Sequence, residues 1–291
     1  MNNFLTLNDL TNEKIIELVE ESLAYKTGKR PIPILNANIA SIFLEPSTRT
    51  KTSFELAAVK SNNYVVNIEE KSSALTKGET FQDTLDTLAH LEIKAAIVRT
   101  STEYFYQDLD TSKIKLINAG DGAHEHPSQC LLDLVTIYER FGTFTGLKIL
   151  IMGDIKHSRV ARSNINAMER LGMEVMVYAP EIFKTDDDFN YIENLEATLQ
   201  TVDCVMLLRN QLERHQDVAT NVQESYLEQY GLTEGRKDLL KTESIIMHPG
   251  PFNRDVELAS SILNDQRNKI YEQVNNGLYA RITILNYVLG E

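Results

Sequence analysis

The feature that most constrains the fold is the alternation of short apolar runs with helical patterns along the chain. The apolar runs have the length of buried strands, and helix-type periodicity lies between them. Parallel strands need a long crossover connection, which a helix commonly supplies. The alternation therefore predicts parallel sheets of the α/β class. The strand-like runs are IASIFL (39–44), YVVNI (64–68), AAIV (95–98), KLIN (115–118), LKILIMG (147–153), MEVMVYAP (173–180), DCVMLL (203–208) and SIIMHP (244–249).

The length of the chain, 291 residues, favours two domains over one. The best point of division is FGTFTG (141–146), where a helical pattern ends in glycines and a new strand-like run begins. We expect two α/β domains, each a parallel β-sheet flanked by helices, joined by two interdomain helices. The first domain is predicted at 1–135, completed by a C-terminal helix at about 268–291, and the second at 136–267.

Charge and composition exclude several classes of function. The formal net charge is -13 and no basic run offsets it, which argues against nucleic-acid binding. No segment reaches the ~18 apolar residues of a membrane span, and MNNFLTLNDLTNEK has no signal-peptide pattern. Cys130 and Cys204 have no metal-type or redox spacing, so we expect two buried thiols in a reducing compartment. Together these features predict a cytoplasmic protein that lacks a metal site.

The segment FLEPSTRTKTSFE (43–55) places four polar residues, Ser47, Thr48, Arg49 and Thr50, between a strand-like run and a helical pattern. The unpaired N–H groups and the dipole of a helix N-terminus favour an anion. Hydroxyl groups and a guanidinium would complete a phosphate site. The alternative is that Ser47 or Thr48 caps the helix and Arg49 is solvated, and this segment alone leaves both open.

The STRT sequence resembles the carbamoyl-phosphate loop of the transcarbamoylases, and further family segments follow in the same order over most of the chain. The KGET lysine and the RxQxxR segment resemble the enzymes that use aspartate, and the SMG-type loop and HCLP segment of ornithine enzymes are absent. HPGPFNRDVE is similar to bacterial catalytic chains that work without a regulatory chain. The further segments are SALTKGET (73–80), HPSQ (126–129), GDIKHSRVARS (153–163), LLRNQLER (207–214) and MHPGPFNRDVE (247–257).

This resemblance implies transfer of the carbamoyl group of carbamoyl phosphate to the amine of L-aspartate. The products would be N-carbamoyl-L-aspartate and phosphate, as in de novo pyrimidine synthesis, with no metal or organic cofactor. Two alternatives are a transcarbamoylase for another amine such as ornithine, and a non-catalytic scaffold subunit. A strand, a GD turn and a helix at 148–163 also resemble half a dinucleotide site, but GxGxxG is absent, which argues against NAD.

The resemblance also implies a set of residues for carbamoyl phosphate. Thr50, Arg99 and His126 would surround the carbonyl oxygen that becomes an oxyanion, with His126 as a neutral donor. Gln129 and the Gly250 carbonyl would bind the carbamoyl amine. Taken alone, the histidine before a proline would be structural. The implied set is Ser47, Thr48, Arg49, Thr50, Ser73, Lys77, Arg99, His126, Gln129, Gly250 and Pro251, of which Arg49, Thr50, Lys77, Arg99 and His126 would be catalytic.

Other implied residues serve aspartate and the assembly. Arg159, Arg209 and Gln211 match the positions that bind the aspartate carboxylates, a task that suits the planar arginine fork, and Lys77 would contribute as well. The SALTKGET loop, which by itself has the composition of an exposed surface loop, would carry Ser73 and Lys77 into the site of a neighbouring chain. The resemblance therefore implies a homotrimer whose active sites are shared between adjacent subunits.

Charge placement suggests a role for Glu45, which adjoins the phosphate loop. Arg159 and Arg214 lie in the second half of the chain. We expect a cationic cleft that binds carbamoyl phosphate first and aspartate second, and that closes with Glu45 holding the two arginines. The alternative is that Glu45 neutralises Arg49 locally.

Overall fold

The computed structural model describes residues 2–69, 77–210 and 219–290. The chain forms two compact units, called unit 1 (Met1–Val135 with Val274–Glu291) and unit 2 (Thr136–Gln273). Each unit contains one four-stranded parallel sheet, which confirms the predicted fold class. Two helices, α4 (Pro127–Phe141) and α9 (Ile270–Leu289), contain the points at which the chain passes from one unit to the other.

The sheet of unit 1 has the strand order β2-β1-β3-β4, and every pairing is parallel. β1 and β3 are central and almost wholly buried, as their continuous apolar sequence predicts, whereas β2 is an edge strand with exposed residues. Phe4 pairs with β4 at Ile117. The strands are β1 (Asn38–Phe43), β2 (Tyr64–Glu69), β3 (Ala95–Thr100) and β4 (Lys115–Asp121).

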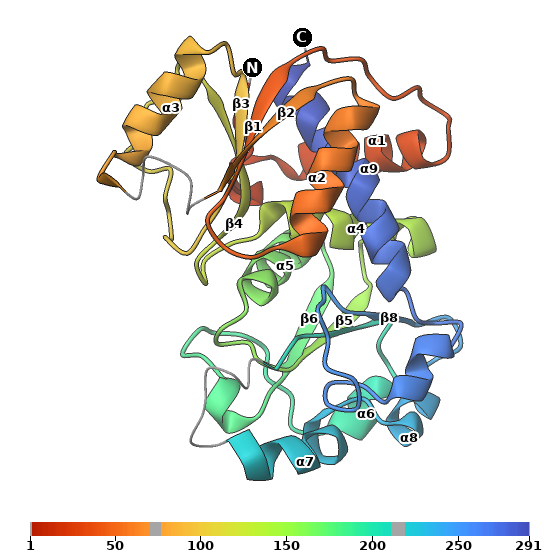
Figure 1. Cartoon of the computed structure of the whole chain (residues 1–291). Helices are drawn as coiled ribbons and strands as arrows, with labels where there is room; N and C mark the ends of the chain where they lie inside the picture. Colours follow the sequence, from red (N-terminus) through yellow and green to blue (C-terminus); the bar gives the residue numbers. More distant parts are fainter. Residues whose placement is uncertain (1, 70–76, 211–218, 291) are drawn as a thin grey trace. The chain divides into compact units, whose positions relative to one another are not determined.

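Helices cover both faces of this sheet. α3 lies on one face, while α1, α2 and α9 lie on the other (Figure 1). Leu85 and Leu88 of α3 pack in one cluster with Ala40 and Ile42 of β1, which fixes that face as part of the core. The helical elements of unit 1 are a 3-10 turn η1 (Leu7–Asp9), α1 (Asn12–Lys26), α2 (Thr48–Lys60) and α3 (Phe81–His90), together with the parts of α4 and α9 assigned to it.

Local sequence explains where several helices begin. Thr11 accepts a hydrogen bond from the Lys14 N–H at the start of α1, and Thr80 and Asp83 form a capping box at the start of α3. Ser158 accepts from the Ala161 N–H at the start of α5 (Arg159–Arg170). The hydroxyl groups of Thr11, Thr80 and Ser158 thus fix where these three helices begin.

The sheet of unit 2 repeats the same plan, with the order β6-β5-β7-β8 and parallel pairings throughout. α5 lies on one face, and α6 and α8 lie on the other (Figure 1). Leu195 and Leu199 of α6 pack with Leu150 and Val205 of the sheet. The elements are β5 (Lys148–Met152), β6 (Glu174–Tyr178), η4 (Glu181–Phe183), α6 (Leu195–Leu199), β7 (Cys204–Leu207), α7 (Ala219–Tyr230), α8 (Glu234–Asp238), β8 (Ile245–Met247) and η6 (Ser260–Asn264).

Both cysteines are buried free thiols, as predicted. None of the helices in the described part of the chain combines the length and apolar character that a membrane crossing requires. Among the same residues, no three His, Cys, Asp or Glu side chains are grouped in a way that could hold a metal ion.

Candidate active site

The predicted residues of unit 1 gather at the carboxyl edge of its sheet. Glu45 to Thr50 follow β1, Arg99 lies near the end of β3, and His126 follows β4. Because β1, β3 and β4 are parallel and adjacent, their carboxyl ends meet at one edge. Ligands of open α/β sheets bind at this edge, so the position is one that favours a site.

The N-terminus of α2 carries the STRT sequence. Ser47 occupies the N-cap position in an extended conformation, but its side chain makes no capping hydrogen bond. Side-chain capping by Ser47 is therefore not the role of this residue. Arg49 is exposed and Thr50 is buried in the first helical turn, which has no acidic residue. The backbone N–H groups of this turn and the neighbouring side chains suit an anion.

Three predicted residues of unit 1 converge on one ring nitrogen. His126 Nε2 lies 3.5 Å from Thr50 Oγ1 and 3.4 Å from Arg99 Nη1, and the histidine is 5% exposed. The Arg99 guanidinium can only donate, and His126 can donate as well when Nε2 carries the ring proton. A carbonyl group bound here, next to a phosphate at the start of α2, would lie close to the Arg99 cation and to the hydrogen-bonding groups of Thr50 and His126.

Glu45 forms an ion pair within unit 1. Its Oε2 lies 3.6 Å from Arg99 Nε, and both side chains are largely buried. The expected engagement of Glu45 with Arg159 and Arg214 stays a prediction, since Arg214 lies outside the described residues.

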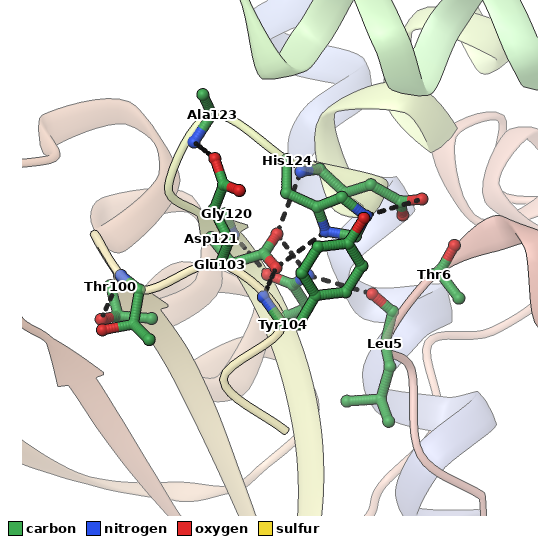
Figure 2. A network of polar contacts seen from close by, with 12 residues as sticks. Leu5, Thr6, Thr100, Glu103, Tyr104, Gly120, Asp121, Ala123 and His124 are labelled. Atoms are coloured by element: carbon green, nitrogen blue, oxygen red, sulfur yellow. Dashed lines mark hydrogen bonds and ion pairs between the residues drawn. The ribbon is translucent and has the colours of Figure 1, made fainter. Parts of the chain in front are cut away.

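A buried carboxylate organises the turn between β4 and His126 (Figure 2). Asp121 is fully buried; its Oδ1 accepts from the Asn118 side chain at 3.1 Å and the Glu125 N–H at 3.0 Å. Its Oδ2 accepts from the Tyr104 N–H at 2.9 Å and lies 3.0 Å from His124 Nδ1. The rings of Tyr104 and His124 are in contact, with their centroids 3.7 Å apart and their planes inclined by 34°. One acidic residue thus fixes the turn that leads to His126.

The same turn is joined to the segment that follows β3. The Gly122 N–H donates to the Thr100 carbonyl at 2.9 Å, and the Ala123 N–H donates to Glu103 Oε1 at 3.2 Å. Gly122 has φ +50°, and a Cβ there would lie 2.9 Å from the Ser101 carbonyl oxygen, so only glycine fits. These bonds hold together the chain segments that carry the arginine of β3 and the histidine after β4.

Glu125 attaches the N-terminal segment to this turn. It is buried and accepts from the Asn8 side chain at 3.1 Å. Burial raises the pKa of Glu125, against the hydrogen bond from Thr6 and the charge of His124, which lower it. The protonated carboxyl group therefore favours the folded state more than the carboxylate does.

Replacing Glu125 by glutamine is expected to raise the free energy of unfolding at neutral pH relative to the wild type. Because the folded pKa lies above the ordinary value of 4.5, the stability contributed by protonation is present below that value and is lost as the pH rises through the folded pKa. Glutamine keeps an acceptor for Asn8 and cannot ionise. Urea unfolding over a pH series would measure the difference, and a difference that does not change with pH would contradict the expectation.

The predicted residues of unit 2 also gather at a carboxyl edge. Arg159 begins α5 after β5, Arg209 follows β7, and Gly250 follows β8; both arginines are half-buried. β5, β7 and β8 are adjacent parallel strands, so these three positions share one edge of the sheet. The peptide bond between Gly250 and Pro251 is cis.

Three of the predicted site residues lie outside the described residues, and a fourth lies beside them. Lys77 is exposed, and it follows directly on a segment outside the described residues. The candidates that lie outside the described residues are Ser73, Gln211 and Arg214.

Sequence reasoning assigned no role to the acidic residues that organise these loops. In unit 2, the buried carboxylate of Glu257 accepts from the Asn210 N–H at 2.8 Å and the Asn253 N–H at 2.6 Å, and burial raises its pKa. It thereby ties the residue after Arg209 to the loop after β8. The available signal is an acidic residue inside an apolar or motif sequence, as in NAGD (118–121) and DVEL (255–258).

Comparison with known protein families agrees with this arrangement. The carbamoyl-P binding domain of the aspartate/ornithine carbamoyltransferases matches residues 2–139, and their Asp/Orn binding domain matches residues 145–288. This chain belongs to the aspartate/ornithine carbamoyltransferase family.

Relatives within this family span almost the whole chain. The aspartate carbamoyltransferase catalytic subunit of Fusobacterium nucleatum is 46% identical over 292 residues, covering 99% of this chain and 96% of that protein. The corresponding subunit of Malacoplasma penetrans is 41% identical, covering 100% of this chain and 97% of that protein.

Solved structures of the carbamoyltransferases have the same fold. Trypanosoma cruzi aspartate transcarbamoylase in complex with carbamoyl phosphate and aspartate is 25% identical, with a TM-score of 0.86 and coverage of 98% of this chain and 95% of that one. Ornithine carbamoyltransferase from Pyrococcus furiosus, 24% identical, has a TM-score of 0.88 and coverage of 99% and 97%. The likeness to the P. furiosus enzyme shows the fold alone.

Proposed function

We propose that this protein is an aspartate carbamoyltransferase, which converts carbamoyl phosphate and L-aspartate to N-carbamoyl-L-aspartate and phosphate in pyrimidine synthesis. The observation that carries the proposal is the convergence of Thr50 and Arg99 on His126, at the sheet edge where α2 begins. The names of the relatives and the ligands of the T. cruzi structure support the same reaction.

The proposed reaction needs positioning and electrostatic stabilisation and requires no protein nucleophile. The aspartate amine attacks the carbonyl carbon, negative charge develops on the carbonyl oxygen, and the bond from that carbon to the phosphate oxygen then breaks. Ser47, Thr48, Arg49 and Thr50 would hold the phosphate with the N–H groups of α2. Arg99, His126 and the Thr50 hydroxyl would stabilise the oxyanion, and the phosphate oxygens would take the amine proton.

We propose aspartate as the acceptor because the predicted residues of unit 2 are cationic. Arg159 and Arg209 would each pair with a carboxylate, whereas the side-chain ammonium of ornithine would face like charge. Lys77 and Gln211 would complete this set, and Gly250 with Pro251 would contact the carbamoyl group. Incubation of purified protein with carbamoyl phosphate and either aspartate or ornithine, with product identification by mass spectrometry, tests the assignment. Carbamoyl-ornithine as the only product would refute it.

We also propose a cytoplasmic homotrimer with sites shared between subunits. Support comes from exposed apolar side chains on α2 and the edge strand β2, where Leu56, Val59 and Tyr64 are 49%, 68% and 70% exposed. A second copy of the chain would cover this face. Lys77 is exposed and so is able to serve a neighbouring chain, with Ser73 of the same loop. Sedimentation equilibrium measures the oligomeric state.

Replacing Glu45 by alanine is expected to raise the KM for aspartate and to lower kcat, while the Kd of carbamoyl phosphate changes less than about twofold. The reason is that Glu45 would hold Arg159 and Arg214 when both substrates are bound, whereas carbamoyl phosphate is held by other groups of unit 1. Glu55→Ala, in α2, which follows the loop of Glu45, is the matched control. If the Kd of carbamoyl phosphate alone changes, Glu45 acts through its observed partner Arg99 instead.

A further inference from the structure

Three buried polar side chains of unit 1 interact: Gln129 is hydrogen-bonded to Asp133, and the charge of Arg281 acts on Asp133. Gln129, in the first turns of α4, donates from Nε2 to Asp133 Oδ1 at 2.9 Å. Asp133 lies one helical turn further along α4 and is fully buried. An ionised carboxylate has acceptors and no donor, so the nitrogen of the Gln129 amide must face Asp133. The orientation of that amide is therefore set by its neighbour.

The other atom of the amide becomes an acceptor of defined position. With Nε2 bound to Asp133, Gln129 Oε1 lies on the opposite side of the amide group. Oε1 has no hydrogen-bond partner among the residues that the structure describes. An oxygen in that place can accept from an N–H group and gains nothing from a methyl group.

Arg281 of α9 is a buried cation that interacts electrostatically with Asp133. It is 2% exposed, and its Nη1 donates to the Gly277 carbonyl at 3.0 Å. Burial lowers the pKa of Arg281 to about 9, while the charge of Asp133 acts in the opposite direction, so the guanidinium keeps its proton at neutral pH. A Cβ on Gly277 would lie 2.6 Å from Nη1, so the glycine in the middle of α9 provides the space for this side chain.

We propose that Asp133 and Arg281 are specificity-determining positioning residues, which hold Gln129 Oε1 toward the carbamoyl amine. The arrangement selects acyl phosphates that carry an NH2 group over those that carry a methyl group in the same place. This proposal rests on the proposed function, together with the expectation from the sequence that the amide of Gln129 binds that amine. It adds the reason why the amide presents its oxygen and not its nitrogen.

The test compares three ligands on the wild type and on Asp133→Asn by isothermal titration: carbamoyl phosphate, acetyl phosphate and inorganic phosphate. An asparagine can donate to Gln129, so the amide can turn and present its nitrogen to the carbamoyl amine. We expect the Kd of carbamoyl phosphate to rise about tenfold, the range of one lost hydrogen bond. The Kd values of acetyl phosphate and inorganic phosphate should change by less than about twofold.

Controls separate positioning from general damage to the fold. Thr283→Val removes a buried hydrogen bond between α9 and Ser22, and it should lower stability without changing the ligand ratio. The double variant Asp133→Asn with Arg281→Met removes both buried charges together and avoids leaving Arg281 unpaired. It replaces the single variant if that one fails to fold, and the same change in ratio is expected.

A Kd that rises equally for all three ligands, or a carbamoyl-to-acetyl ratio that stays at the wild-type value, would overturn the proposal. The binding ratio does not depend on turnover. A wild-type protein that prefers carbamoyl phosphate but forms no carbamoyl-aspartate would therefore refute the proposed function and leave the role of Asp133 intact.

Discussion

Replacement of His126 by alanine is expected to lower kcat for carbamoyl-aspartate formation by about 10²-fold to 10³-fold, the range for loss of one preorganised donor to an oxyanion. The donor position is defined by its neighbours, because Thr50 Oγ1 and Arg99 Nη1 both lie within 3.5 Å of His126 Nε2. Steady-state kinetics with both substrates saturating measures this effect.

A change confined to KM would contradict this role, since it would indicate binding that is equal in the ground state and the transition state. His90→Ala is the matched control, because His90 is an exposed histidine of α3 in the same unit. The thermal unfolding temperature should be compared for both variants, so that a loss of fold is not read as a loss of catalysis.

The fold could be predicted from the sequence because the strands of parallel sheets are buried on both faces. Such strands have continuous apolar sequences, and each predicted run overlaps one strand, although the edge strand β2 is partly exposed. AAIV (95–98), for example, lies in β3, which is central and almost entirely buried. The strand order was not predictable in the same way, because pairing depends on packing between segments far apart in the chain.

The candidate site, too, could be predicted only in part. Residues such as Arg49 and His126 belong to short local motifs, which a sequence displays directly. Their supporting partners are not part of these motifs. The hydrogen bond from the Tyr104 N–H to Asp121 joins residues 17 positions apart, and the charge of Arg281, near the end of the chain, acts on Asp133 of α4. Only the folded structure brings such partners together. It also shows that these charged groups are buried, where a charge is costly unless it is paired or hydrogen-bonded.

If the protein is the proposed homotrimer, mixing two inactive variants, Arg49→Ala and Lys77→Ala, is expected to restore carbamoyl-aspartate formation after dissociation and reassembly of the subunits. Arg49 would hold phosphate in its own chain, whereas the exposed Lys77 would serve the adjacent chain. In randomly mixed trimers, about one site in four would combine an intact Arg49 with an intact Lys77, and would have wild-type activity. The expected change is from near zero to about a quarter of the wild-type rate per chain.

The matched control is a chain that carries both substitutions, mixed with Arg49→Ala. No site in that mixture can contain Arg49, so activity should stay at the level of the parent variants. Recovery in this control would mean that reassembly itself, and not complementation, restores the rate. If the first mixture stays inactive while sedimentation shows hybrid trimers, Lys77 acts within its own chain. The exposed face of Leu56, Val59 and Tyr64 would then be an interface that joins subunits without sharing their sites.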